Sequence, residues 1–199
     1  MFRLSHYVFG LVLVGGLCVP AAKAAAIIDF VQSGSNVVAT GSGSLNTSAL
    51  TNFGLVTNGT GSVNATYPEA MLGAPVVNGD SIQTYISIAG PSTFGTGGYF
   101  MASSGSGSVF GLYAGGQLAV PGGYVSGNTL SSSDTWTGTT LAGLGLTPGS
   151  YVYSWGTPGT TYDTLTINVG SATPEPGSLS LMILGGAGLL VRRKLRHTR

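Results

Sequence analysis

Alternation of apolar and polar positions is the clearest pattern in this chain, and it is confined to the middle of the sequence. Three short runs show it: SIQTYISIA (81–89), SYVYSW (150–155) and DTLTINV (163–169). A period of two residues gives a strand one apolar and one polar face, as in an antiparallel sheet with one buried side. The pattern predicts three rows that each share one face: Ile82, Ile86 and Ile88; Tyr151, Tyr153 and Trp155; Leu165, Ile167 and Val169.

Turn-forming residues separate these runs and indicate the fold class. They are Asn58-Gly59, Asn78-Gly79, Pro121-Gly122-Gly123, Pro148-Gly149 and Pro158-Gly159. Short β-branched and aromatic runs with such punctuation are typical of sandwiches and jelly rolls. Helical periodicity is absent before residue 178. The sequence therefore predicts an all-β domain over residues 25–172, built as an antiparallel β-sandwich or jelly-roll-like fold.

Two stretches of small residues leave the local structure open. Residues 41–44 and 103–108 consist almost entirely of glycine and serine. They fit either flexible loops or strands of small side chains. On both interpretations we expect a thin core at these positions.

The first 24 residues have the three parts of a secretory signal peptide. MFRLSHY supplies a basic start, residues 8–19 an apolar core, and the following residues a zone of small side chains. Ala22 and Ala24 form an A-x-A pattern, so we expect cleavage after Ala24, with a cut after Ala26 as the next candidate. A retained anchor is the alternative. However, the 12 residues of the apolar core reach only about 18 Å as a helix, against a bilayer core of ~30 Å.

Residues 173–199 form a terminal segment in three parts. Pro174, Glu175 and Pro176 favour an extended backbone, because each proline fixes its own φ and restricts the residue before it. Residues 179–191 are apolar except for one serine, and they give about 20 Å of helix, which is short for a permanent span. The last eight residues are rich in basic side chains: Arg192, Arg193, Lys194, Arg196 and Arg199.

This arrangement predicts a membrane stop that is cut away after export. The basic tail favours the cytoplasmic side, while the short helix holds the extended tripeptide just outside the bilayer. A stable single-pass anchor is the alternative that the short span alone does not exclude.

PEPGSLSLMILGGAGLLVRRK resembles the PEP-CTERM sorting signal of Gram-negative exported proteins. Pro174, Glu175 and Pro176 match the family's motif residue by residue, while Thr173 and Gly177 depart mildly from its flanking positions. The resemblance implies processing by exosortase, a membrane transpeptidase. NVVATGSGSLNTSALT and LTPGSYVYSWGTPGTTYDTLTINVG also resemble a recurrent β-domain of this family. The resemblance implies association with extracellular polysaccharide or biofilm matrix, and it carries over no catalytic residue.

Charged residues are few and unevenly distributed along the chain, and this limits the kinds of molecule that the protein can bind. Charged residues make up 7% of the chain, against roughly 25% in ordinary soluble proteins. Between Ala24 and Arg192 there is no Lys, Arg, His or Cys. This excludes nucleic acid as a partner and a disulfide or thiolate metal site in the middle. Cys18, the only cysteine, follows bulky Leu17, which disfavours a lipoprotein signal.

The same scarcity argues against catalysis. Without His, Cys, Lys or Arg, the middle lacks the usual bases and nucleophiles. A carboxylate glycosidase is a remote alternative, for which the five candidates are Asp29, Glu69, Asp80, Asp134 and Asp163. The spacing of these residues singles out no pair and no calcium loop. We interpret Ser133-Asp134 and residues 78–81 as turns whose side chains cap local backbone groups.

Aromatic residues offer a better-motivated binding function. Tyr151, Tyr153 and Trp155 share one strand face, and Trp136 lies in another candidate strand. Flat rings of this kind stack on sugars in a carbohydrate-binding module, or they fill the core of a glycine-rich sandwich, which we favour.

The sequence as a whole predicts an exported, non-enzymatic protein of the cell surface or matrix that needs no cofactor and no metal. It crosses the inner membrane, is held there transiently by its terminal helix, and is then released to the surface or the extracellular space. Its expected partners are the general secretion machinery, signal peptidase, an exosortase-type transpeptidase and, as a ligand, extracellular polysaccharide.

Overall fold

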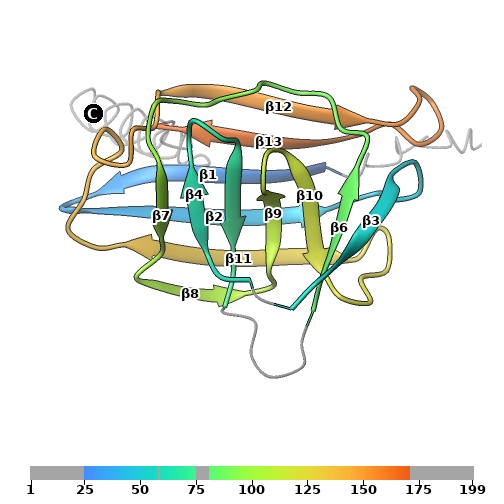
Figure 1. The fold of residues 1–199 in the computed structure, drawn as a ribbon, viewed down its shortest axis with the longest axis horizontal. Helices are drawn as coiled ribbons and strands as arrows, with labels where there is room; N and C mark the ends of the chain where they lie inside the picture. The colour runs from blue at the N-terminus through green and yellow to red at the C-terminus, as the bar shows by residue number, and fades with distance from the viewer. Residues whose placement is uncertain (1–24, 58, 75–80, 171–199) are drawn as a thin grey trace, which may run out of the picture.

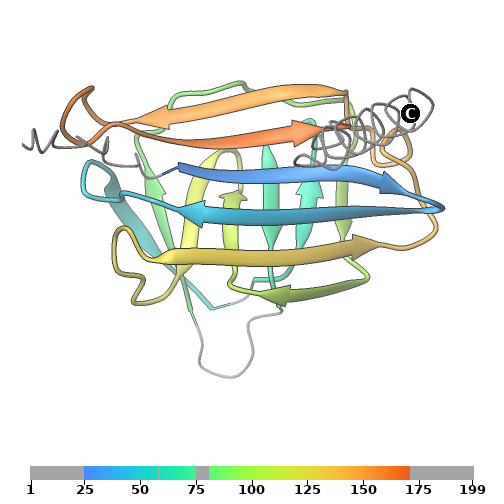
Figure 2. The ribbon, with the colours of Figure 1, turned by 180° about the vertical axis from the view of Figure 1, so that it is seen from behind.

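The computed structural model describes residues 25–57, 59–74 and 81–170, and these form two facing β-sheets (Figures 1 and 2). The thirteen strands are β1 (Ala25–Ser33), β2 (Asn36–Ser44), β3 (Thr51–Val56), β4 (Ser62–Asn64), β5 (Glu69–Leu72), β6 (Ile82–Ile86), β7 (Tyr99–Met101), β8 (Ser104–Gly107), β9 (Phe110–Tyr113), β10 (Gln117–Pro121), β11 (Thr129–Trp136), β12 (Gly149–Trp155) and β13 (Asp163–Val169).

One sheet has six strands in the order β12-β13-β1-β2-β11-β8, and the other has seven in the order β3-β6-β10-β9-β5-β4-β7. Figure 1 shows that the strands of the seven-stranded sheet run across those of the six-stranded sheet behind it, as in orthogonally packed sheets. The all-β sandwich predicted from the sequence is therefore confirmed. Within the described ranges, no helix has the length and hydropathy needed to cross a bilayer.

The pairing is antiparallel except between β1 and β13. These two strands run parallel from Ala25, opposite Thr164, to Phe30, opposite Val169. Parallel neighbours need a long connection, and here the rest of the domain supplies it. The first and last strands of the described domain therefore lie side by side in the middle of one sheet.

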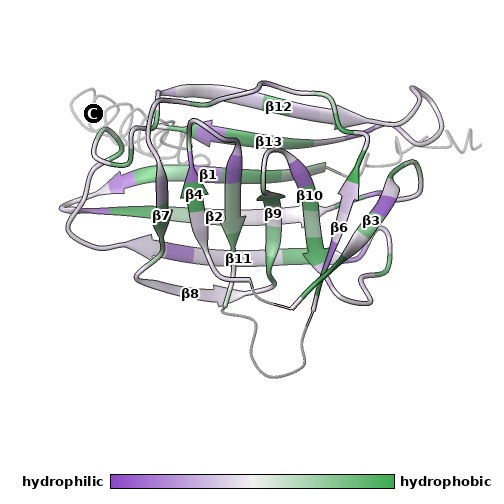
Figure 3. Cartoon of the chain, in the orientation of Figure 1, coloured by the Kyte–Doolittle hydropathy of each residue, from purple (hydrophilic) through white to green (hydrophobic). Residues whose placement is uncertain are grey.

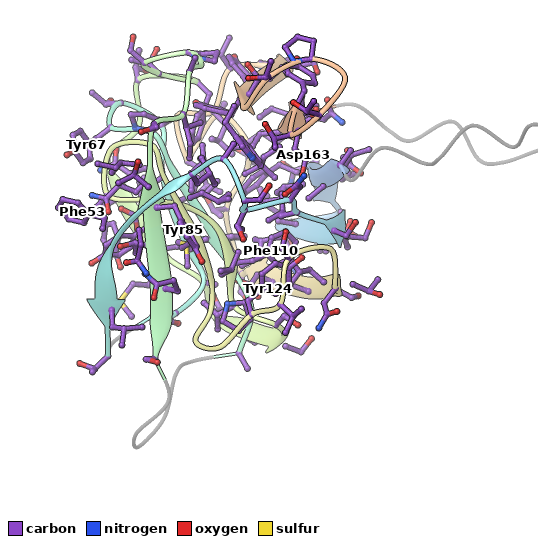
Figure 4. All side chains as sticks on the ribbon, turned by 90° about the vertical axis from the view of Figure 1, so that its right-hand side faces the viewer. Phe53, Tyr67, Tyr85, Phe110, Tyr124 and Asp163 are labelled. Atoms are coloured by element: carbon purple, nitrogen blue, oxygen red, sulfur yellow. The ribbon has the colours of Figure 1, made fainter. Side chains whose placement is uncertain are left out.

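The main core lies between the sheets, and Phe30, Phe110 and Trp136 are among its largest members. Figure 4 shows Phe110 between the two layers. Phe30 and Trp136 pack with ring centroids 5.7 Å apart. Figure 3 shows the apolar segments along strands such as β9, β10 and β13, whereas the edge strand β8 is pale because it consists of serine and glycine.

The small-residue stretches form strands, which decides between the two interpretations left open by the sequence. Residues 41–44 complete β2, and residues 104–107 form β8. At Gly41 the two sheets pack closely, because a Cβ there would lie 2.7 Å from Phe110 Cζ and 2.9 Å from Leu72 Cδ1. The glycine makes room for a large ring from the opposite sheet.

The alternating runs behave as predicted in two strands of three. Tyr151, Tyr153 and Trp155 belong to the main core or pack against it, and the row on β13 is buried throughout. The row predicted from Ile82 to Ile88 is wrong, because β6 ends at Ile86 and Ser87 adopts a φ of 77°.

This break at Ser87 divides the isoleucines between two environments. Ile82 packs with Met71 and Ala119 in a second apolar cluster, whereas Ile88 packs against the main core. Ile86 is 37% exposed.

Candidate functional site

The predicted processing residues lie outside the described part of the chain. These are Ala22 and Ala24 at the signal-cleavage position, Pro174, Glu175 and Pro176 of the sorting motif, and Arg192, Arg193, Lys194 and Arg196 of the basic tail. Asp80 is also outside it. The candidate sites described below lie in the sandwich itself.

The aromatic row on β12 is part of the core rather than a stacking surface. Tyr153 is 2% exposed and Trp155 is 4% exposed. Trp155 Nε1–H donates to the carbonyl of Asn46 at 2.7 Å, and the Tyr151 hydroxyl donates to the carbonyl of Thr147 at 2.9 Å. Polar tips that bond to the protein's own backbone are typical of buried aromatics. The rings of Tyr153 and Trp155 therefore offer no flat face for a sugar, as the core interpretation expected, and Tyr151 packs partly buried against the same core.

Each described carboxylate forms hydrogen bonds with a different part of the fold. Asp29 accepts from Asn168 Nδ2 at 2.8 Å, and Glu69 accepts from Ser62 Oγ at 2.5 Å. Buried Asp134 and Asp163 bind different backbone segments, described below. Among the described residues, no three His, Cys, Asp or Glu side chains form a group that could hold a metal ion.

Asp134 lies in the middle of β11, so its interpretation as a turn residue is wrong. It is 1% exposed, and the backbone N–H of Gly73 donates to its two oxygens at 3.1 and 3.2 Å. The carboxyl group therefore links β11 to the end of β5 in the opposite sheet. Two glycines make room for it: a Cβ on Gly61 would lie 1.7 Å from Oδ2, and one on Gly105 would lie 2.4 Å from Oδ1.

Burial raises the pKa of Asp134 to about 6, although hydrogen bonds from the backbone of Gly73 and Ser106 partly oppose the shift. Burial likewise raises the pKa of Asp163. A carboxyl whose pKa is higher in the folded than in the unfolded state contributes most stability below its ordinary pKa of 3.8. That contribution is lost as the pH rises toward 6.

We therefore expect Asp134→Asn to flatten the dependence of stability on pH. Asparagine resembles the protonated acid and keeps an oxygen for the Gly73 N–H. In urea unfolding, the free energies of the variant and the wild type should run parallel below about pH 4, and the variant should gain relative to the wild type between pH 4 and 7. A constant difference across this range would show that folding does not raise the pKa of Asp134.

Asp163 fastens the loop that follows β2. Its Oδ2 accepts from the backbone N–H of Asn46 at 2.5 Å, and its Oδ1 accepts from Thr164 N–H at 2.7 Å. The hydroxyl of Tyr124 accepts from Leu45 N–H at 3.0 Å. Figure 4 shows Asp163 and Tyr124 at the end of the sandwich that faces the viewer. This network is structural, because the Asp163 carboxylate and the Tyr124 hydroxyl both accept hydrogen bonds from backbone N–H groups.

A pocket of about 430 Å³ lies at another edge of the sandwich. Its walls come from the β4–β5 turn, the segment after β6, the β9–β10 turn and β12, and its lining residues are Tyr67, Pro68, Ile88, Gly90, Pro91, Ser92, Gly115, Gly116 and Tyr153. Ligand pockets are typically ~300–1,000 Å³ in volume. We call this site the Tyr67 pocket. Among the described residues, no charged side chain lines it.

Two glycines shape the pocket by lying directly against aromatic rings. A Cβ on Gly115 would lie 2.4 Å from Tyr67 Cζ, and one on Gly90 would lie 2.2 Å from Tyr153 Cδ1. Gly115 also has a φ of 83°, which favours glycine. The Tyr153 hydroxyl donates to the Pro91 carbonyl at 3.0 Å, and burial raises the pKa of Tyr153 to about 12. Tyr67 is 57% exposed, and Figure 4 shows it pointing outward.

No known protein family, curated protein or solved structure matches this chain. The pocket and the buried carboxylates therefore have to be interpreted from their own chemistry.

Sequence reasoning missed the Tyr67 pocket, because its residues come from four separate places along the chain. Local signals were nevertheless present. Asn64 lies three residues before Tyr67, and its Oδ1 accepts from Tyr67 N–H at 3.1 Å, as in Asx-type turns. Gly115-Gly116 is a turn signal as well, but neither pattern reveals that the two turns share a wall.

Proposed function

We propose that this chain is an exported, non-enzymatic protein of the cell surface or extracellular matrix, delivered by a PEP-CTERM-type sorting signal. One observation carries the proposal. The two sheets are built from strands that all lie between the predicted signal peptide and the predicted sorting segment, and the last of them ends at Val169, four residues before that segment. A folded sandwich thus occupies the part of the chain between the two segments that are expected to be removed.

The composition and bonding of the sandwich support a non-catalytic role. The middle of the chain has no Lys, Arg, His or Cys. Among the described residues, every buried side-chain nitrogen and oxygen has a hydrogen-bond partner, which is typical of structural rather than reactive groups. A sandwich of this kind serves as a stable, weakly charged unit in a polysaccharide-rich surrounding.

The remote glycosidase alternative gains no support. A retaining or inverting pair needs two carboxyl groups that face one cleft across the sugar. Asp134 and Asp163 are each 1% exposed, and they bind the backbone of Gly73 and Asn46 respectively. Both carboxylates hold the fold together.

The mature protein is expected to start at Ala25. Ala25 and Ala26 are strand residues paired with Thr164 and Leu165, and Ala26 is fully buried. A cut after Ala26 would remove both from the sheet, so strand β1 favours the cut after Ala24. N-terminal sequencing of the exported form tests this: a start at Ile27 would contradict the strand argument, and a start at Met1 would contradict the signal peptide.

Cell fractionation tests the proposed localisation. In a Gram-negative host that encodes an exosortase, the processed protein should be found outside the inner membrane, and a signal-peptide variant such as Leu11→Arg should accumulate in the cytoplasm. Residue 11 lies in the apolar core of the signal, where a charge blocks insertion. Wild-type protein confined to the cytoplasm would refute the proposal.

A further inference from the structure

The Tyr67 pocket is held open by the protein's own backbone. Thr66 N–H donates to the Gly97 carbonyl at 2.9 Å, and Phe94 N–H donates to the Ala65 carbonyl at 3.0 Å. These bonds tie the β4–β5 turn to the segment after β6. That segment is in turn fixed to β12, because Ala89 and Ser154 exchange backbone hydrogen bonds of 2.9 and 2.8 Å. A ligand would therefore meet a preformed site and order little on binding.

The lining of the pocket selects for a neutral ligand. In the part of the chain that the structure describes, neither an acidic nor a basic side chain lines it. Glu69 follows Pro68 in the chain, but its carboxylate accepts from Ser62 Oγ and Glu69 is 8% exposed. A charged ligand would find no counter-charge to replace its hydration.

The remaining groups match a sugar ring. The exposed ring of Tyr67 offers a flat apolar face beside Pro68 and Pro91, and the hydroxyl of Ser92 and the glycine peptide groups offer hydrogen bonds. A pyranose presents the same combination: C–H groups on its faces and hydroxyls around its edge. A proline-rich peptide also favours aromatic grooves, but it docks along several exposed rings, whereas here Tyr153 is buried and only Tyr67 is free to stack.

We propose that the Tyr67 pocket binds a neutral sugar unit of an extracellular polysaccharide, with Tyr67 as the stacking residue. The inference rests on the proposed function, because it names the ligand class that the exported protein would meet. It moves the stacking role from the β12 aromatic row to Tyr67, and leaves Tyr153 of that row as a buried wall of the pocket.

Isothermal titration calorimetry with the exported chain tests the inference. The probes are neutral oligosaccharides derived from dextran, laminarin and galactomannan, with alginate oligosaccharides as acidic counterparts and a decaproline peptide as the competing class. At least one neutral probe should bind with a Kd of about 5 mM or tighter. Tyr67→Ala should weaken that binding about tenfold, which corresponds to a loss of about 1.4 kcal/mol.

Tyr99→Ala is the matched control, because Tyr99 is 54% exposed and lies on β7 outside the pocket lining. It should leave binding unchanged. If Tyr67→Ala does not fold, Ser92→Leu decides instead: residue 92 is exposed at the pocket, and an aliphatic side chain there should block the site without removing a packed group.

Three results would overturn the inference: no neutral probe binds, Tyr99→Ala weakens binding as much as Tyr67→Ala does, or decaproline binds with the dependence on Tyr67 expected for the sugar. Fractionation of the same preparations separates this failure from that of the proposed function. Normal export and processing without sugar binding would refute only the pocket's assignment.

Discussion

Replacing Gly61 with Ala is expected to destabilise the sandwich by about 3 kcal/mol, the upper part of the range for an added group in a packed core. Gly61 lies just before β4, and a Cβ there would be 1.7 Å from Asp134 Oδ2 and 3.1 Å from the Cβ of Ala102. The carboxyl group cannot simply turn away, because the Gly73 N–H holds both its oxygens and Gly105 lies on its other side. Urea unfolding measures the loss.

A double-mutant cycle identifies the cause of this loss. Asp134→Ala alone should also destabilise, since it leaves the buried Gly73 N–H without a partner. Combined with Gly61→Ala, it removes the clash, so the double variant should be more stable than the sum of the single effects by at least about 1 kcal/mol. Gly98→Ala is the control: a Cβ there meets nothing within 4 Å, so its effect should stay within about 0.5–1 kcal/mol. If the two losses in free energy simply add, the clash between residue 61 and the Asp134 carboxyl group is not the cause.

Replacing both Pro174 and Pro176 with Ala is expected to trap nearly all of the protein, unprocessed, in the inner membrane. The sequence predicts that the two prolines favour an extended backbone around Glu175, and an extended substrate is what the proposed cleaving enzyme would require. Alanine, a strong helix former, would remove this preference. The predicted signal peptide lies at the other end of the chain and is unchanged, so we expect the variant still to leave the cytoplasm. Immunoblotting of membrane and extracellular fractions measures the shift.

The control for this variant lies within the same segment. Thr173→Ala changes the residue before the motif without altering either proline, and it should be processed normally. Equal processing of the wild type and the double-proline variant would argue that the tripeptide is not the recognised element.

The local alternation of apolar and polar residues predicted the buried faces of the strands that pair without interruption. Residues 150–155 and 163–169 alternate cleanly, and the edge strand β12 and its neighbour β13 bury the rows that alternation indicates. The row at Ile82, Ile86 and Ile88 looked equally regular. It failed because a positive φ at Ser87 interrupts it, and periodicity carries no information on such a break.

The buried carboxylates and the Tyr67 pocket depend on contacts between distant residues, which a single sequence does not reveal. Asp134 looked like a turn residue beside Ser133, yet its bonding partner is Gly73, 61 positions away. Tyr67 meets Gly115 across two turns. The glycines at 41, 61 and 105 likewise have a reason only in the side chains that fill the space above them. The sequence shows that these positions are glycine, but it does not show which side chains pack against them.

Mass spectrometry of the intact mature protein, from cells with and without the exosortase gene, tests the central claim most directly. The account predicts a chain that begins at Ala25 and lacks residues 179–199 in the parent strain, and a chain that retains those residues in the inner membrane of the deletion strain. Mature protein lacking residues 179–199 in normal amount in the deletion strain would contradict it, and a general protease would then replace the sorting enzyme.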